Sequence, residues 1–395
     1  MKMNEEINKM RDNINENVDV VIIGSGIMGL STAYYLAETG FKICIIEREN
    51  YIGGHTTLRC AGGFRQQFSS SMNITLSILN RRMIKELEKD ARCKIPFNSC
   101  GYAFAFTKED SAIQAEKAVK MQKEMSVNVE FLSTKNIKKT FTNMYVDDVL
   151  LTTYCRDDGL IDVGALLGVL KRRLDEFGVS ILTNKAVCGI ETQNGEISKV
   201  LLDNGEIKTT IVVNAAGPWA KQIGDMVDVI IPIQPSLQQI WVTEPTSLIK
   251  NDMPVIIFED ERIGFHWESG GLLSGYHRPQ KQEIITFPEI DLDWEVLHCQ
   301  KAVERMPKLY EMKLASRWAG FYETTTDDLP IIGSFGPAGM YCIAGFNGHG
   351  LMHGLACGYL LSNIITGKST DVDISTLSLY RFNNKPFVNA EKYII

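Results

Sequence analysis

The sequence lacks the features of a membrane or secreted protein. No apolar run is long enough to cross a bilayer; residues 351–365, for example, are interrupted by His353, Ser362 and Asn363. The first 17 residues mix both charge signs without an apolar core, which predicts a polar extension or short helix rather than a signal peptide. The nine cysteines are scattered, odd in number and form no CxxC pair, which indicates a reducing compartment. We therefore expect a cytoplasmic protein with no membrane span.

An excess of positive charge and metal-ligand patterns are also missing. The net charge of -7 at pH 7 does not favour binding to nucleic acid. None of the six histidines has cysteine or carboxylate partners at metal-ligand spacing, so we predict no metal site. A chain of 395 residues that is 45% hydrophobic and contains 32 glycines is typical of a globular protein of two domains. Its partners should be small molecules or proteins.

One segment near the N-terminus has the pattern of a dinucleotide-binding unit. The β-branched run VDVVII, residues 18–23, leads directly into GSGIMG, in which Gly24, Gly26 and Gly29 have the spacing G-x-G-x-x-G. A small-residue helix follows, and a second apolar strand over 42–46 ends at an acidic residue. Together they form a βαβ unit of about thirty residues.

Each part of this unit has a physical role in binding a dinucleotide. Gly24 permits the tight turn, Gly26 lets the backbone approach a pyrophosphate, and Gly29 lets helix and strand pack closely. The helix N-terminus offers free N–H groups to the anion. Glu47 should accept hydrogen bonds from the adenosine ribose and would repel a 2′-phosphate, which argues against NADP. NAD and FAD both remain compatible with the unit itself.

Further motifs resolve that choice through a resemblance. The chain is similar to the D-amino-acid oxidase superfamily of FAD enzymes, and most of all to the sarcosine oxidase β-subunit and L-proline dehydrogenase β-subunit group. Four segments that span nearly the whole chain carry the match: VVIIGSGIMGLSTAYYLAETG with IIERE, GGHTTLRCAGGFRQQF, VVNAAGPWA, and RWAGFYETTTDDLPIIG running on to GFNGHGLMHG. The resemblance implies a non-covalent FAD that extends from the first glycine turn to the last glycine loop.

The motif and the resemblance together assign a set of residues to FAD. In the family the last glycine loop faces the flavin, where backbone N–H groups and a helix dipole would stabilise the charge of the reduced ring. The predicted FAD-binding residues are Gly24, Ser25, Gly26, Ile27, Met28, Gly29, Glu47, Arg48, Gly54, His55, Thr56, Thr57, Ala61, Gly62, Gly63, Val187, Ala215, Ala216, Gly217, Trp219, Gly345, Phe346, Asn347, Gly348, His349, Gly350, Leu351 and Met352.

The FAD motifs are separated along the chain, so we expect a discontinuous, Rossmann-like FAD-binding domain in an α/β plus α+β fold. Between the motifs, residues 101–110, 237–245 and 262–277 are rich in alternating, β-branched or aromatic residues. They predict a substrate domain with a mostly antiparallel sheet, flanked by helices over 110–125 and 292–306. The predicted division is a polar N-terminal extension at 1–17, an FAD-binding domain at 18–92, 148–222 and 325–385, and a substrate-binding domain at 93–147 and 223–324.

Candidate residues for catalysis come from the same resemblance. Dehydrogenation of an amino acid requires a clamp for its carboxylate, and the planar fork of arginine suits that task. Arg65 falls next to the position where sarcosine oxidases carry a carboxylate-binding arginine, and Arg59 is the second candidate. Either arginine could instead form a structural ion pair or contact the FAD phosphate.

Four further positions bear on the chemistry. The stretch GGLLSGYH, residues 270–277, resembles a G-L-K-x-G-x-H pattern of monomeric sarcosine oxidases, whose lysine promotes the reaction of reduced flavin with oxygen. His277 occupies the histidine position, near the substrate or as a structural residue, whereas Leu273 replaces the lysine. Tyr322 aligns with a substrate-side tyrosine, and Gly320 stands where those oxidases tether the flavin through cysteine. These differences predict a dehydrogenase with non-covalent FAD.

The sequence leaves three functions open. The first is oxidation of the C–N bond of a secondary or N-methylated amino acid, sarcosine- or proline-like, to an imine by hydride transfer to flavin N5. The second is oxidation of a 2-hydroxy acid or glycerol phosphate, for which His277 is the candidate base. The third is an FAD-bearing subunit of an electron-transfer complex. A small amino acid is therefore the expected substrate, with a hetero-oligomeric subunit or electron acceptor as a further partner.

Overall fold

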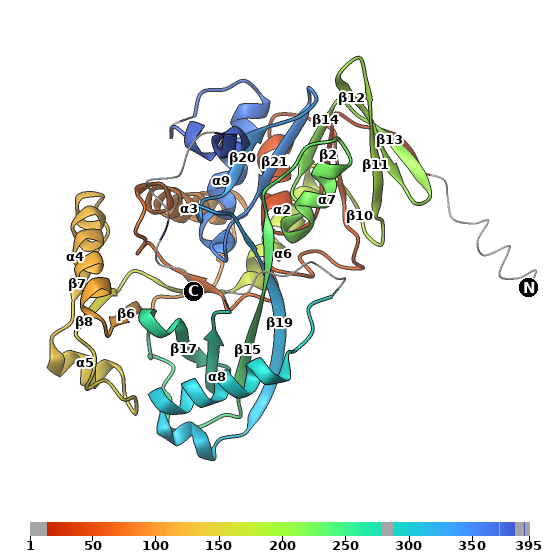
Figure 1. The fold of residues 1–395 in the computed structure, drawn as a ribbon. Helices are drawn as coiled ribbons and strands as arrows, with labels where there is room; N and C mark the ends of the chain where they lie inside the picture. Colours follow the sequence, from red (N-terminus) through yellow and green to blue (C-terminus); the bar gives the residue numbers. More distant parts are fainter. Residues whose placement is uncertain (1–13, 279–286, 371, 384–390, 392–395) are drawn as a thin grey trace, which may run out of the picture.

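Two large sheets, one mostly parallel and one mostly antiparallel, organise the chain (Figure 1). The computed structural model describes residues 14–278, 287–370, 372–383 and 391. Most of the N-terminal extension and the end of the last FAD-binding segment, predicted at 1–17 and 325–385, therefore lie outside the described residues. The combination of α/β and α+β architecture confirms the predicted fold class.

The first sheet has six strands in the order β10-β3-β2-β14-β21-β20, parallel except for the antiparallel pair β20 and β21. Strands β2 and β3 are buried at every position, as expected of strands that are covered on both faces. They confirm the two strands predicted for the βαβ unit. The bounds are β10 Ser180–Leu182, β3 Ile43–Ile46, β2 Val20–Ile23, β14 Ile211–Asn214, β21 Met340–Ala344 and β20 Ile331–Ser334.

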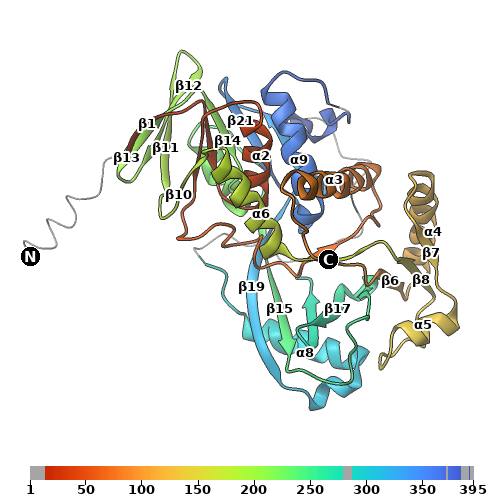
Figure 2. The ribbon, with the colours of Figure 1, turned by 180° about the vertical axis from the view of Figure 1, so that it is seen from behind.

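Four helices gather beside this sheet, and two of them carry the glycine loops (Figure 2). Helix α2 packs on α9 at small residues: a Cβ at Gly354 would lie 2.5 Å from Cγ1 of Ile27, and the Ser31 hydroxyl donates to the Gly354 carbonyl at 2.8 Å. Because each helix begins at one of the glycine loops, this packing brings the loops together. The helices are α2 Ile27–Ala37, α3 Ser71–Asp90, α6 Val163–Glu176 and α9 Gly350–Ile365.

A four-stranded sheet lies beyond the six-stranded one and corrects the prediction for the N-terminus. Residues 14–17, expected to belong to a polar extension or short helix, form strand β1, which pairs in parallel with β13. Pairing with a distant strand decides this conformation, so the local sequence did not reveal it. The strands, in sheet order, are β1 Ile14–Asn17, β13 Gly205–Lys208, β12 Glu196–Leu202 and β11 Val187–Gln193.

The second large sheet has eight strands, and only its β16–β6 pair is parallel. It confirms the mostly antiparallel sheet and the two helices predicted to flank it. Strand β8, which the predicted boundaries placed with FAD binding, instead pairs with β6 and β7 in this sheet. In sheet order the strands are β19 Leu314–Thr324, β15 Gln234–Thr243, β18 Gly271–Tyr276, β17 Ile263–Glu268, β16 Val255–Phe258, β6 Tyr102–Phe106, β8 Leu151–Cys155 and β7 Val129–Phe131. The helices are α4 Glu109–Glu124, α5 Thr134–Thr140 and α8 Leu292–Arg305.

Short elements complete the described part of the chain. A small sheet is formed by β4 Gly63–Phe64, β9 Gly159–Ile161 and β5 Phe97–Asn98. Helix α7 covers Ala220–Asp225, and the 3-10 helices are η1 Gly217–Trp219, η2 Glu259–Glu261, η3 Pro307–Glu311, η4 Ser375–Leu377 and η5 Leu379–Asn383.

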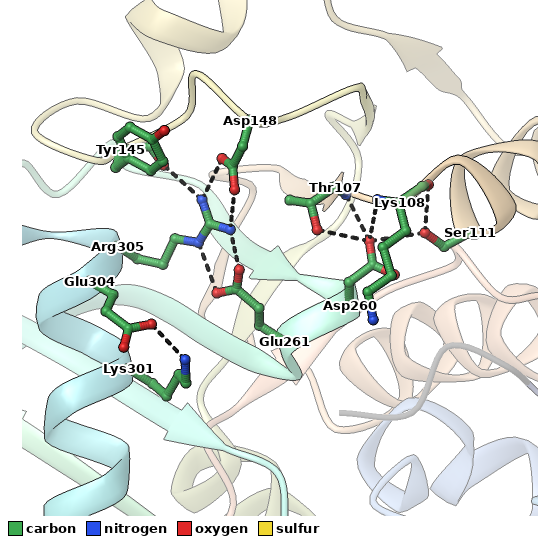
Figure 3. A network of polar contacts seen from close by, with 10 residues as sticks. All are labelled: Thr107, Lys108, Ser111, Tyr145, Asp148, Asp260, Glu261, Lys301, Glu304 and Arg305. Carbon is green, nitrogen blue, oxygen red and sulfur yellow. Dashed lines mark hydrogen bonds and ion pairs between the residues drawn. The ribbon is translucent and has the colours of Figure 1, made fainter.

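An ion network around the buried Arg305 fixes α8 to the eight-stranded sheet (Figure 3). Arg305, at the end of α8, donates to both carboxylate oxygens of Asp148 at 2.7 and 2.9 Å and also pairs with Glu261 of η2. These bonds hold the pKa of Asp148 below its usual range. The neighbouring Asp260 accepts hydrogen bonds from the backbone N–H groups of Thr107 and Lys108, at the start of α4. The network joins three elements that are far apart in the sequence.

Candidate functional site

A single cavity of about 450 Å³ extends between the six-stranded sheet and the eight-stranded sheet. Both glycine loops line it: Gly24 and Gly26 from the first, Gly348 and Gly350 from the last. Some 300 residues separate the two loops along the chain. The cavity is therefore one site built from both ends of the protein.

Backbone contacts shape the end of the cavity at the first turn. Gly24 has φ +104°, and a Cβ there would lie 2.5 Å from the carbonyl oxygen of Ala215. A Cβ at Gly29 would lie only 1.9 Å from the Gly24 carbonyl oxygen, so Gly29 lies under the turn rather than on the cavity wall. The Thr57 hydroxyl accepts from the N–H of Ile27 at 3.1 Å. Further N–H groups of the first turn of α2 remain for an anion.

Glu47 is held in place by the same turn. Its carboxylate accepts from the N–H and the hydroxyl of Ser25, at 2.9 and 2.5 Å, and from the N–H of Glu49 at 2.9 Å. A carboxylate has about four acceptor positions. The arrangement therefore leaves capacity for the hydroxyl of a ribose at the end of β3.

A cluster of charged and aromatic side chains forms the wall beside Glu47. The guanidinium of Arg48 lies over the Trp219 ring, 4.4 Å from its centroid. His55 contacts the same ring and the carboxylate of Glu49, at 2.8 Å. Burial lowers the pKa of His55, against the effect of Glu49. The cluster presents a largely neutral imidazole and a stacked arginine to the cavity at neutral pH.

The last glycine loop is held against the eight-stranded sheet by Tyr322. A Cβ at Gly348 would lie 2.6 Å from the Tyr322 ring, so only glycine permits this approach. Asn347 is buried behind the loop, where its amide donates to the carbonyl of Gly345 at 2.8 Å and its oxygen accepts from the N–H of Thr325 at 2.9 Å. These bonds fix the path of the chain into α9.

One row of cross-strand neighbours on the eight-stranded sheet forms the opposite wall. Ile257, Gly264, Gly275, Ile240 and Trp318 pair successively across β16, β17, β18, β15 and β19, and all five line the cavity. The two glycines contribute no side chains to this wall, and their Cβ positions lie 2.6 Å from Cδ1 of Ile257 and 3.2 Å from Cγ2 of Ile240. This wall is apolar and suits an apolar substituent on a substrate.

The three predicted catalytic residues differ in their relation to the cavity. Tyr322 lines it, and burial raises the pKa of its phenol to about 12. Neither Arg65 nor His277 lines it. The ring of His277 lies 6.0 Å from that of Tyr322, and burial lowers the pKa of His277 to about 4. His277 is therefore neutral at pH 7.

Arg65 lies behind the part of the cavity wall that includes Tyr322 and is only 2% exposed. Its guanidinium donates to the carbonyl of Gln67, contacts Nε2 of His349 at 3.3 Å and stacks on Phe68, 4.1 Å from the ring centroid. Its charge also lowers the pKa of Tyr322, although burial has the larger effect. Arg59, in contrast, lines the cavity and donates to the carbonyls of Ala319 and Gly54, at 2.9 and 3.3 Å.

The cavity wall includes many of the predicted site residues but not all of them. Most of the predicted FAD-binding residues, and Tyr322, lie on its wall. The exceptions shape the loops from behind or lie beneath the wall, and they are Gly29, Arg65, His277, Gly345, Asn347 and His349.

Several cavity residues were not predicted. Tyr102, Gln238, His266 and Glu323 line it from β6, β15, β17 and β19. Their strands were predicted, but the face of each strand that borders the cavity follows from pairing between distant segments. Alternation within RIGFHW could have grouped Gly264 with His266, though not placed them at the site.

The residues present fit FAD. The glycine cradle at Gly24 and Gly29 leaves no room for a Cβ, the start of α2 offers N–H groups, and Glu47 has acceptor capacity for a ribose. The cavity is long enough to connect these groups with the second glycine loop, since both line it. The structure thus has the features of a dinucleotide-binding protein, with a cavity that extends from the first glycine turn to an antiparallel sheet.

Comparison with known proteins gives the family. The chain belongs to the FAD dependent oxidoreductase family (DAO), which matches residues 19–364. This membership confirms the resemblance to the D-amino-acid oxidase superfamily and FAD as the cofactor.

Individual relatives cover nearly the whole chain. "FAD-dependent oxidoreductase domain-containing protein 1" of Bos taurus is 26% identical over 93% of this chain and 85% of the relative. Mitochondrial sarcosine dehydrogenase of Homo sapiens is 28% identical over 93% of this chain, which spans only 41% of that relative. The crystal structure of L-proline dehydrogenase from P. horikoshii superimposes with a TM-score of 0.84 and 26% identity, over 94% of this chain and 99% of that one.

Two kinds of feature are absent from the described residues: a membrane-spanning helix and a cluster of metal ligands. No helix among them has both the length and the apolar character needed to cross a membrane. Nor do the described histidine, cysteine, aspartate and glutamate side chains form a group of three or more that could hold a metal ion.

Proposed function

We propose that the protein dehydrogenates a small secondary or N-methylated amino acid, sarcosine- or proline-like, to an imine. FAD, when bound, supplies the acceptor of the hydride. The observation that supports this function most is the single cavity, in which both glycine loops meet an apolar sheet face. The names of two relatives, sarcosine dehydrogenase and L-proline dehydrogenase, point to the same substrate class.

The side chains around the cavity divide the remaining work. Ile257, Ile240 and Trp318 present an apolar surface to the apolar part of the substrate. Tyr322, a neutral phenol at pH 7, can hydrogen-bond with the substrate, and the positive charge of Arg65 behind it favours a carboxylate at that end. His277 is buried and neutral at pH 7, so it adds no positive charge to that of Arg65.

Anaerobic mixing of the purified protein with a panel of substrates tests this function. Sarcosine, proline and other amino acids should bleach the flavin absorbance, whereas 2-hydroxy acids and glycerol phosphate should not. Bleaching by hydroxy acids alone would support the second function, with His277 as the base. Failure of every small molecule to bleach a bound flavin would favour an electron-transfer subunit instead.

We further propose that the protein is a dehydrogenase rather than an efficient oxidase. Leu273 lines the cavity and is buried, so this position supplies no cation to stabilise superoxide. Leu273→Lys should speed reoxidation of the chemically reduced flavin by oxygen by about tenfold or more. Leu273→Met is the matched control and should not. Rapid reoxidation of the unaltered protein would contradict the proposal.

A further inference from the structure

One buried carboxyl group in the cavity has an unmet hydrogen-bonding capacity. Glu323 is the penultimate residue of β19; it lines the cavity and is only 7% exposed. Its Oε2 atom is buried and has no hydrogen-bond partner among the described residues. A buried polar atom of this kind costs free energy unless a ligand or water completes it.

The position of Glu323 along the cavity identifies the part of the ligand it faces. A Cβ at Gly217, in the turn after β14, would lie 3.5 Å from Oε2 of Glu323. The backbone N–H groups of Gly345 and Phe346, in the last glycine loop, also interact with the carboxyl group. Glu323 therefore lies between the turn after β14, which packs against the first glycine turn through Ala215, and the loop that precedes α9.

The polyol chain of FAD joins the pyrophosphate to the flavin, and its functional groups are hydroxyls. A carboxylate oxygen without a partner is a suitable acceptor for a hydroxyl. We propose that Glu323 binds FAD by accepting a hydrogen bond from a hydroxyl of its polyol chain. This inference rests on FAD binding and is independent of the choice of substrate.

The electrostatics of the group agree with this role. Burial raises the pKa of Glu323 to about 7, although the N–H groups of Gly345 and Phe346 lower it. The carboxyl is therefore poorly solvated as it stands. A hydroxyl donor would stabilise its ionised form.

Ligand fragments separate this role from a structural one. The full-length protein, freed of FAD, is titrated with FAD and with ADP, which lacks the polyol and the flavin. Glu323→Leu should weaken FAD binding by about tenfold or more, as expected for a hydrogen bond to a charged group, and leave ADP affinity unchanged. Glu323→Gln retains an acceptor oxygen and should stay within about threefold of the unaltered protein. Glu47→Gln, at the ribose end, should weaken both ligands.

Three outcomes would overturn the inference. The first is unchanged FAD affinity in Glu323→Leu, and the second is an equal loss for ADP and FAD. If Glu323→Leu does not fold, Glu323→Met serves in the same comparison, and unchanged FAD affinity in that variant is the third. Failure of the amino acid panel to bleach the flavin would contradict the proposed substrate class and leave this result intact.

Discussion

The two ends of the cavity are built in different ways. At the first glycine turn the contacts are made by backbone atoms within one βαβ unit, such as the carbonyl of Gly24 under Gly29. At the other end the wall is formed by residues of five strands of the eight-stranded sheet, from Ile257 to Trp318, and three of them contribute side chains. A site formed by backbone atoms has almost no room for an added atom. In a site formed by side chains, substitutions can change the ligand preference while the fold is retained.

The largest effect should come from adding one methyl group at the first glycine turn, where backbone atoms form the cavity. Gly29→Ala places a Cβ 1.9 Å from a backbone oxygen, which must move. We expect loss of FAD on purification and a destabilisation of about 3 kcal/mol or more. Thermal unfolding and flavin absorbance measure both effects.

Gly168→Ala is the matched control for this change. Gly168 lies in α6 with nothing within 4 Å of an added Cβ, so the same substitution should be neutral or stabilise by about 0.5–1 kcal/mol. Equal behaviour of the two variants would show that the first turn is not as tightly packed as the structure indicates.

A second comparison concerns the two arginines at the substrate end. Arg65→Gln should lower kcat/KM for an amino acid by about tenfold, because it removes the positive charge that lies behind Tyr322 and favours a carboxylate at that end of the cavity. Arg59→Gln should cost less, since its guanidinium already donates to the carbonyls of Ala319 and Gly54. Steady-state kinetics measure both variants, and FAD content and melting temperature control for the burial of Arg65. A larger loss in Arg59→Gln would make Arg59 the carboxylate clamp.

The contrast between the two ends also explains what could be predicted. The strands at 20–23 and 43–46, helix α2 and Glu47 follow from a local pattern, because a βαβ unit is encoded within about thirty residues. Residues 14–17 and strand β8 take their conformation and place from distant partners, so their assignment was wrong.

The same distinction applies to individual site residues. Motifs predicted Tyr322, Arg65 and His277 alike as catalytic residues, but of the three Tyr322 lines the cavity, whereas Arg65 and His277 lie behind its wall. A motif gives the order of residues along a strand; the depth of each side chain depends on packing between sheets. Glu323 was missed because an acidic residue at a strand end has no distinctive local pattern.

Substrate preference should change when a methyl group is added at Gly275, on the sheet wall of the cavity. A Cβ at Gly275 would lie 3.2 Å from Cγ2 of Ile240, so Gly275→Ala requires only a small shift of a side chain. We expect kcat/KM for the bulkier amino acids to fall by about tenfold relative to the smallest ones, within the 1–3 kcal/mol that such pocket contacts contribute. FAD affinity should not change. An equal loss for all substrates would mean that the wall at Gly275 does not border the substrate.

The smallest effect should come from His277, which lies behind that wall. Its pKa is about 4 in the folded protein and 6.5 ordinarily, so the unfolded chain binds the proton more readily and this group destabilises the fold as pH falls below 6.5. His277→Gln should therefore reduce the loss of stability between pH 7 and pH 5 by about 1–2 kcal/mol. Above pH 6.5 it should change neither stability through this linkage nor the shape of the pH profile of amino acid oxidation. Loss of an acidic limb from that profile would instead identify His277 as a catalytic base. It would contradict the structural role of His277 behind the wall.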